Sequence, residues 1–387
     1  MAYLVGNIGS LIINDSMWGV VHQKKKHAFA VEGDKIIWVG EESKAPACDA
    51  RLDVEGGCVI PGFVDSHAHP VFAGSRELEF AARMAGETYQ AGGINSTVTA
   101  TRAASKNELR ANLQRLQSEL FAGGITHFEA KSGYGLDVET ERISLEVARE
   151  FTEDTTFLGA HLVPLGANPD SYVDLVTGEM LEAAAPLAKW IDVFCDEGAF
   201  DLEQSRRVLL AGIARGLKPR IHANQIRNIG AIDLAIELDC ASADHCTHLS
   251  DHDVDLLAGG NTVATFLPGA EFSTRSAYPN AGRLLNAGAR IAIATDCNPG
   301  SSFTTSMGFC IAVAVREMGL SVDQAFYAAT IGGANALRDD TLGNITEGNR
   351  ADFAVLDAPN HFYFAYRPGV QLVTQTFVAG KKVFERK

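Results

Sequence analysis

Short runs of apolar, often β-branched residues alternate with longer amphipathic stretches over most of this chain. Such alternation is typical of βα units built around a parallel sheet. Eight runs fit the pattern: Val59–Val64, Thr126–Lys131, Thr156–His161, Ile191–Asp196, Lys218–His222, Ser242–His245, Thr262–Leu267 and Arg290–Asp296. Eight repeats predict a (β/α)8 barrel of the α/β class, whose active site belongs at the carboxyl ends of the strands.

Helical segments are expected between these runs, and the two ends of the chain carry a different pattern. The clearest amphipathic stretches are Lys106–Phe121, Glu139–Phe151, Leu202–Arg215, Ile229–Leu238 and Phe303–Met318. Residues 1–56 and 343–387 instead contain short apolar or alternating runs between Gly, Asp and Asn turns. We therefore predict one composite β-sandwich domain from both ends, with the barrel occupying residues 57–342.

Composition narrows the class of protein. The 387 residues exceed what one hydrophobic core usually serves, which fits a barrel with an appended domain. The 33 basic and 48 acidic residues give a formal charge of −15, which disfavours nucleic acid and anionic membranes as partners. We expect a small-molecule partner. The sequence leaves open whether the protein forms a homodimer.

Cysteine usage and the amino terminus indicate a cellular location. The seven cysteines are scattered, odd in number and without a Cys-x-x-Cys pair, so reduced thiols are expected. No basic segment followed by a signal-type apolar run opens the sequence, and no window approaches a membrane span. These features predict a cytoplasmic protein.

Polar residues gather where the predicted strands end. His67 and His69 follow the first run at i, i+2, a spacing that puts both imidazoles on one face of an extended chain. The residues at or near the eight strand ends are His67 and His69, Lys131 and Tyr134, His161, Asp196 and Glu197, His222, His245, Glu271, and Asp296 with Asn298. Core packing explains one buried histidine, but not histidines at the same end of several strands. They predict a shared metal site, since imidazole suits zinc and iron.

Several motifs resemble the amidohydrolase superfamily. The general ones are Pro61–His69, the His222 and His245 strands, and Ala294-Thr295-Asp296. More specific ones resemble the branch that opens the imidazolone ring of a propionate-bearing substrate in histidine degradation: Val71–Glu77, Lys131–Leu136, Gly159–Pro164, His222–Gln225, Ser242–His245 and Ala294–Ser301. The resemblance covers nearly the whole chain and implies hydrolysis of a cyclic amide C–N bond.

The resemblance implies one metal ion per chain, zinc or iron, held by His67, His69, His222 and Asp296. Three neutral imidazoles and one carboxylate leave room for a water, whose pKa a metal lowers from about 15.7 to about 7. Asp296 can also accept the proton of that water, while His245 can polarise the substrate carbonyl or stabilise an oxyanion. The sequence leaves open the choice of metal and the division of these roles.

The implied substrate needs a cation for its propionate and hydrogen bonds for its ring. Arg76 can bind a carboxylate with two parallel hydrogen bonds. The alternative role of this arginine is a surface salt bridge. By the same resemblance, further substrate or product contacts are Tyr134, His161, Asn298, Gly300 and Ser301, with Gly300 permitting close backbone approach. Gln225 stands where some relatives have glutamate; it cannot act as a base and is expected to hydrogen-bond the ring.

Some features depart from the resemblance or admit another interpretation. The loop from Tyr89 to Gly93 is short for the family, which leaves its effect on substrate choice open, and Ser301 replaces a common threonine. Related two-metal barrels use a carbamylated lysine at the Lys131 position, but here we expect an unmodified lysine paired with Asp196 or Glu197. The acidic group of Asp192, Asp196, Glu197 and Asp201 is expected to form a solvated or lysine-paired rim.

Two other functions stay open. A deaminase of a purine-like or pyrimidine-like ring would share the scaffold, but such enzymes usually carry glutamate at the Gln225 position. A non-catalytic barrel would serve as a binding or assembly subunit. The presence of all four candidate ligands together with His245 argues against that second alternative.

Overall fold

The computed structural model describes residues 1–86 and 93–387, which form two compact units. The first unit contains Met1–Ser66, Ser118–His127 and Thr305–Lys387, and the second contains His67–Gln117 and Phe128–Thr304. The predicted domain limits at residues 56/57 and 342/343 stay a prediction. The predicted short loop at Tyr89–Gly93 lies, apart from Gly93, outside the described residues. Among the described residues no helix combines the length and apolar character needed to cross a bilayer.

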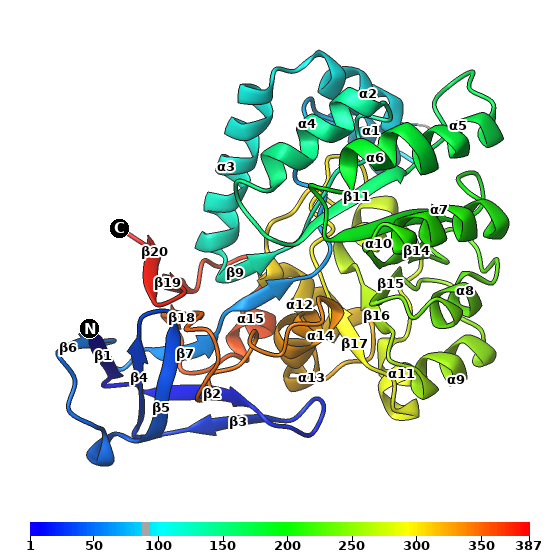
Figure 1. The fold of residues 1–387 in the computed structure, drawn as a ribbon. Helices are drawn as coiled ribbons and strands as arrows, with labels where there is room; N and C mark the ends of the chain where they lie inside the picture. The colour runs from blue at the N-terminus through cyan, green and yellow to red at the C-terminus, as the bar shows by residue number, and fades with distance from the viewer. Residues whose placement is uncertain (87–92) are drawn as a thin grey trace. The chain divides into compact units, whose positions relative to one another are not determined.

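The first unit contains two β-sheets. One has the order β5 (Lys35–Glu41), β4 (His27–Glu32), β1 (Ala2–Gly6) and β6 (Ala50–Asp53); the other has the order β20 (Lys381–Glu385), β19 (Val373–Val378), β18 (Phe353–Leu356), β7 (Cys58–Pro61), β2 (Ser10–Asn14) and β3 (Val21–Lys24). Strand β18 runs antiparallel to β7, so strands from both ends of the chain share one sheet (Figure 1). The composite β domain expected from the sequence is thus present.

Aromatic residues join the two sheets. Phe29 on β4 meets Phe353 on β18 edge to face with ring centroids 5.0 Å apart, and Phe353 stacks on Phe377 at 4.3 Å. All three are buried in one apolar cluster with residues such as Val5 and Leu11. This contact accounts for the alternation of apolar and polar residues in the terminal strands, because each sheet buries one face.

The first unit also holds one strand pair and several helices. Strand β8 (Phe63–Asp65) pairs with β9 (Ile125–Phe128). The helical segments are η1 (Glu42–Lys44), the end of α3 (Lys106–Ala122), α12 (Met307–Glu317), α13 (Val322–Tyr327), η4 (Ala328–Gly332), α14 (Gly333–Ala336) and α15 (Tyr363–Tyr366). The predicted Phe303–Met318 helix begins only at Met307, after Ser306 caps it by accepting the Phe309 N–H.

The second unit is a curled parallel sheet with helices outside it (Figure 1). Its strands are β10 (Ala130–Lys131), β11 (Thr155–Ala160), β12 (Trp190–Cys195), β14 (Ile221–Ala223), β15 (Ser242–His245), β16 (Val263–Phe266) and β17 (Ile291–Ile293), with β13 (Lys218–Pro219) beside β12. Each neighbouring pair is parallel, and each strand overlaps one of the last seven predicted runs. The first predicted run, Val59–Val64, is instead divided between β7 and β8 of the first unit. The predicted α/β class with repeated βα units is confirmed.

Helices follow these strands as predicted. They are α4 (Val138–Ala148), α5 (Pro169–Leu175), η3 (Val176–Met180), α6 (Leu181–Ala184), α7 (Leu202–Ala214), α8 (Ala231–Glu237), α9 (Asp251–Gly259), α10 (Pro268–Thr274) and α11 (Ala281–Ala287), with α1 (Glu77–Met84) and α2 (Ile94–Ala103) nearer the amino terminus. Capping boxes begin α7 at Asp201 and α9 at Ser250. In both, the cap side chain and the N3 side chain satisfy backbone N–H groups that would otherwise lack partners.

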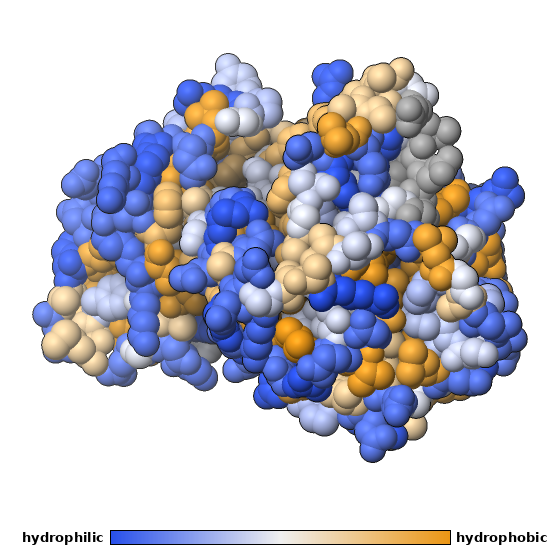
Figure 2. All heavy atoms as spheres, turned by 90° about the horizontal axis from the view of Figure 1, so that it is seen from above, coloured by the Kyte–Doolittle hydropathy of each residue, from blue (hydrophilic) through white to orange (hydrophobic). Residues whose placement is uncertain are grey.

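Hydrophilic residues cover much of the face shown in Figure 2, and hydrophobic residues occur there in separate patches. This surface suits a chain with a formal charge of −15. All seven cysteines are free thiols, and six of them are buried, as expected for a protein without disulfides.

Candidate metal centre and active site

The strand ends of the second unit bring the predicted ligands together. His222 lies on β14, His245 ends β15, and Asp296 follows β17. The extended segment of His67 and His69 lies beside Asp296, because the Asp296 N–H donates to the His67 carbonyl at 2.9 Å and the His69 N–H donates to the Cys297 carbonyl at 3.0 Å. All these side chains are buried.

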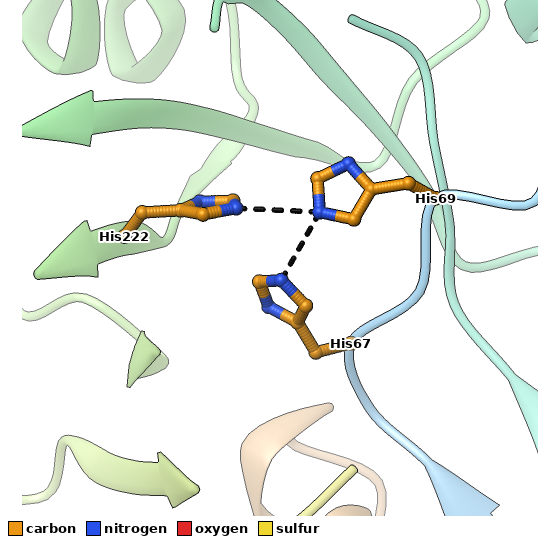
Figure 3. Close-up of side chains that lie close together, drawn as sticks. All are labelled: His67, His69 and His222. Carbon is orange, nitrogen blue, oxygen red and sulfur yellow. Dashed lines mark hydrogen bonds between the residues drawn. The ribbon is translucent and has the colours of Figure 1, made fainter. Parts of the chain in front are cut away.

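Three imidazoles converge on one point (Figure 3). The Nε2 atom of His69 lies 3.1 Å from Nε2 of His67 and 3.3 Å from Nε2 of His222. The Oδ1 atom of Asp296 lies 3.6 Å from Nε2 of His67 and 3.5 Å from Nε2 of His69. A tetrahedral ion with metal–nitrogen bonds of about 2.0–2.1 Å would space its ligand atoms at about 3.4 Å. The Oδ1 atom of Asp296 and the Nε2 atoms of His67 and His69 thus have the spacing of ligands that share a cation, and Nε2 of His222 lies at such a distance from His69.

The other ring nitrogens show which tautomers are present. Nδ1 of His67 lies 2.8 Å from Oδ2 of Asp244, and Nδ1 of His222 lies 3.1 Å from Oδ2 of Asp192. A carboxylate on Nδ1 requires the proton there, so both Nε2 atoms are acceptors. One proton on His69 can satisfy only one of two such acceptors, whereas a metal ion satisfies all three rings.

Electrostatics agree with a cation at this point. Burial, followed by the charge of Lys131, holds the pKa of His67 well below its ordinary value, and burial does the same for His69. Both rings are therefore neutral, the form that binds metal. Burial raises the pKa of Asp296 well above its ordinary value, although the Ser301 hydroxyl donates to its Oδ2 at 3.1 Å. A nearby cation would favour the ionised carboxylate. The residues fit a metal ion.

The structure corrects the expected partners of Lys131. Its Nζ donates to Oδ2 of Asp192 at 2.7 Å and to Oε1 of Glu129 at 2.9 Å, not to Asp196 or Glu197. Asp196 accepts the backbone N–H groups of Ile226 and Arg227 instead. A carbamate on Lys131 would place a third negative group between two carboxylates, which supports the unmodified lysine. Asp192 is fully buried and paired with Lys131, so of the two predicted environments of the acidic group the lysine-paired one applies to this residue and the solvated one does not.

A small pocket opens beside the histidine cluster. Its lining residues are His69, Arg76, Ile94, Tyr134, His161, Leu162, Phe194, His222, Gln225, His245, Asp296, Asn298 and Ser301. This set holds every predicted site residue except His67 and Gly300. The three apolar lining residues were not predicted, because such residues look like core in a sequence. For Leu162 its place directly after His161 was the available signal.

Arg76 lies in the pocket wall. Its side chain is 4% exposed, and Nε and Nη2 both donate to Oε2 of Glu79, at 3.0 and 2.7 Å. A Cβ on Gly300 would lie 2.0 Å from Nη1 of Arg76, so only glycine allows this approach. Arg83, also buried, donates to the Gly300 carbonyl at 2.7 Å. In place of the surface salt bridge considered from the sequence, Arg76 is buried and pairs, within residues 1–86 and 93–387, with the partly exposed Glu79.

Two predicted ring contacts lie beside the histidine cluster. His161 stacks on His69 with centroids 5.3 Å apart and its planes at 26°, and Tyr134 lies 5.3 Å from His161. The Nδ1 atom of His161 lies 2.9 Å from the Gly133 carbonyl, which makes Nδ1 the donor and Nε2 an acceptor. Burial lowers the pKa of His161 to about 3, so this ring is neutral.

The loop after β17 winds around Asn298. The Asn298 Oδ1 accepts the N–H groups of Gly300 and Ser301, both at 2.8 Å, while its Nδ2 donates to the Asp296 carbonyl at 2.6 Å. Asp296 and His245 have φ angles of 53° and 75°. Positive φ is strained for such residues and persists only where neighbouring contacts enforce it, commonly at functional sites.

Glu271, expected near the seventh strand end, is buried close to this region without lining the pocket. It accepts the Thr247 hydroxyl at 2.8 Å, and burial raises its pKa to about 7.

Comparisons with known proteins agree with this geometry. Residues 58–383 match the amidohydrolase family model. The chain is 57% identical to an imidazolonepropionase of Mycolicibacterium smegmatis, over 99% of this chain and 98% of that protein. It is 50% identical to an imidazolonepropionase of Cutibacterium acnes, over 98% of this chain and 97% of that one.

Comparison with solved structures tests the fold of the chain. E. coli guanine deaminase superposes with a TM-score of 0.74 at 18% identity, covering 100% of both chains. A zinc-bound adenosine deaminase from Xanthomonas campestris superposes with a TM-score of 0.73 at 18% identity, covering 98% of this chain and 92% of that one. At such identities the likeness concerns fold alone, and it confirms the predicted fold class. The family, with the histidine and aspartate cluster, indicates a divalent metal site. This chain belongs to the amidohydrolase family and, within it, to the imidazolonepropionases.

Proposed function

We propose that this chain hydrolyses the ring C–N bond of 4-imidazolone-5-propanoate to give N-formimidoyl-L-glutamate in histidine degradation. One observation carries the proposal: a single pocket is lined by His69, His222 and Asp296 of the metal cluster and by the buried cation Arg76. A metal centre beside a carboxylate-binding group suits a small cyclic amide with an acidic tail. Relatives more than half identical over nearly the whole chain carry the same enzyme name.

His67, His69, His222 and Asp296 would hold one zinc or iron ion. When bound, such an ion supplies Lewis-acid chemistry and lowers the pKa of water to about 7. Ser301 orients Asp296 by donating to its Oδ2, which leaves Oδ1 directed at the histidines. Asp244 and Asp192 fix the ring orientations of His67 and His222 through their Nδ1 atoms.

Asp296 would accept the proton of water, and His245 would stabilise the negative charge that develops on the substrate. Water adds to the ring carbonyl carbon, and Asp296 accepts its proton. The C–N bond then breaks, the carbonyl carbon becomes a carboxylate, and the ring nitrogen takes up a proton. His245 lines the same pocket with its centroid 5.4 Å from that of His222, and burial holds its pKa well below the ordinary value. A neutral His245 is suited to donate one hydrogen bond to the carbonyl oxygen as negative charge develops there.

The remaining lining residues would position the substrate. Arg76 would bind the propionate through its guanidinium group. Glu79 accepts hydrogen bonds from Nε and Nη2 of Arg76 and thereby fixes the plane of that group. Gln225, His161 and Tyr134 would contact the ring, and the loop of Asn298, Gly300 and Ser301 would contact the product. Leu162 and Phe194 add apolar walls to the pocket.

The test is turnover by the purified full chain. Loss of the ultraviolet absorbance of 4-imidazolone-5-propanoate is expected, with formation of N-formimidoyl-L-glutamate by mass spectrometry. Removing metal with a chelator should abolish turnover, and adding back zinc or iron in separate samples should show which ion restores it. Ammonia released from a purine or pyrimidine base, with no imidazolone turnover, would instead identify a deaminase.

We also propose that the enzyme acts in the cytoplasm, which the seven free thiols support. Its expected partner is a small molecule. Sedimentation of the full chain would decide between monomer and homodimer.

A further inference from the structure

Five charged residues lie fully buried together in the second unit, next to the proposed metal ligands. They are Glu129, Lys131, Asp192, Arg220 and Asp244, each with 0% exposure. Asp192, Asp244 and Lys131 come from three strands of the parallel sheet. Glu129 falls in the break between β9 and β10, and Arg220 falls in the break between β13 and β14. We call these five residues the buried charge network.

Two cations hold three carboxylates in this network. Lys131 donates to Asp192 at 2.7 Å and to Glu129 at 2.9 Å, and its Nζ lies 3.9 Å from Asp244. Arg220 lies 3.4 Å from Glu129 and 3.6 Å from Asp244, with its guanidinium carbon 5.3 Å from the centre of the Trp190 ring. Every carboxylate therefore faces at least one cation, and Lys131 lies near all three.

Packing alone does not require such a network. Burying an ion costs several kcal/mol even after relaxation, and apolar residues of similar volume often replace buried ion pairs without loss of stability. The network meets the proposed ligands at two contacts, Asp244 with Nδ1 of His67 and Asp192 with Nδ1 of His222. The network can thus affect the site by orienting those two imidazole rings.

The charge balance fits the same interpretation. The three carboxylates of the network outnumber its two cations, Lys131 and Arg220, by one formal charge in a buried region. A cation at the histidine cluster would offset that charge.

We propose that Lys131 and Arg220 are positioning residues, which fix Asp192 and Asp244 so that His67 and His222 already point Nε2 at one another before an ion arrives. This inference rests on the metal site of the proposed function. Without Lys131, Asp192 loses the ammonium donor to its Oδ2 and keeps the Val193 N–H, which donates to Oδ1 at 2.7 Å, so the carboxylate can turn relative to His222. The site then binds its ion more weakly, while the pocket residues that contact substrate are unchanged.

The test compares zinc affinity in full-length variants by competition with a chromophoric chelator. Lys131→Met should bind zinc about 10- to 100-fold more weakly, the usual effect of losing a residue that orients a metal ligand. The matched control is Lys106→Met, which removes a lysine paired with Glu146 on exposed helices and should leave zinc affinity unchanged. Nitrogen NMR of the metal-free chains should show His222 with Nδ1 protonated in the parent and as a mixture of tautomers in Lys131→Met.

A double variant separates positioning from charge and also serves if the single variant fails to fold. Lys131→Met with Glu129→Gln keeps the net charge of the network but still removes the lysine donor to Asp192, so weak zinc binding is expected. Parental affinity in a folded single or double variant would overturn the proposal. If the parent chain binds no zinc, the metal site itself is wrong. If it binds zinc but leaves imidazolone propionate intact, the proposed substrate fails and this inference stands.

Discussion

Replacing Arg76 by lysine tests whether the pocket recognises a carboxylate through the planar guanidinium group. The side chain is almost fully buried and held by Glu79 through two nitrogens, so its orientation is fixed before substrate arrives. Lysine keeps the positive charge but loses the planar pair of N–H donors, because an ammonium group is a point charge on a flexible side chain. We expect substrate binding to weaken and the chemical step to be largely unaffected.

The size of the effect follows from the bonds lost. A hydrogen bond to a charged group contributes about 1.5–3 kcal/mol, which corresponds to roughly a 10- to 150-fold rise in KM for the loss of one such bond. Since the propionate is remote from the breaking C–N bond, the loss falls on ground state and transition state alike. That outcome raises KM with little change in kcat.

Steady-state kinetics on the imidazolone substrate measure this split. Arg110→Lys is the matched control, because Arg110 on α3 pairs with Glu150 in the turn after α4, and neither residue lines the pocket. A substrate analogue without the carboxylate should be a poor substrate for the parent and equally poor for Arg76→Lys. A KM of Arg76→Lys within twofold of the parent value, or rapid hydrolysis of that analogue by the parent, would refute the role of Arg76.

Three further predictions concern the metal cluster and its surroundings. The parent chain should hold one ion, and His222→Ala should lose ion and turnover together; elemental analysis that finds two ions per chain, or full activity without any, contradicts this. His245→Ala should keep the ion and lose about 100- to 1000-fold in kcat, the usual cost of one oxyanion donor; a metal-free variant would make His245 a ligand, and normal turnover would make it dispensable. Glu271 has a pKa of about 7 in the folded chain, above its ordinary value of 4.5, so folding favours its protonated form. Its contribution to stability is therefore lost as pH rises from about 4.5 to 7, and Glu271→Gln should flatten this part of the stability curve in urea unfolding across pH 5–8; an unchanged slope would show that Glu271 is not the group that titrates.

The metal cluster could be predicted from the sequence because its ligands follow apolar runs, and the ends of parallel strands meet at one edge of a sheet. The partners of Lys131 could not. Asp192 lies inside the apolar run of β12 and Asp196 lies after it, so only the register of neighbouring strands shows that Asp192 faces Lys131. Glu79 was within reach of prediction, since it stands three residues after Arg76 and such pairs meet at the start of a helix.

The shared sheet of the first unit has a consequence for synthesis on the ribosome. Ile60 pairs with Ala354, and β19 and β20 complete the sheet beyond β18, so nearly the whole chain must be made before β7 gains its neighbour on that side. Until then one edge of β7 presents unpaired backbone N–H and C=O groups, the kind of edge that recruits other strands and promotes aggregation. A chain that stalls before residue 353 would keep that edge exposed. The first unit can therefore reach its stable form only after the last strands have been made.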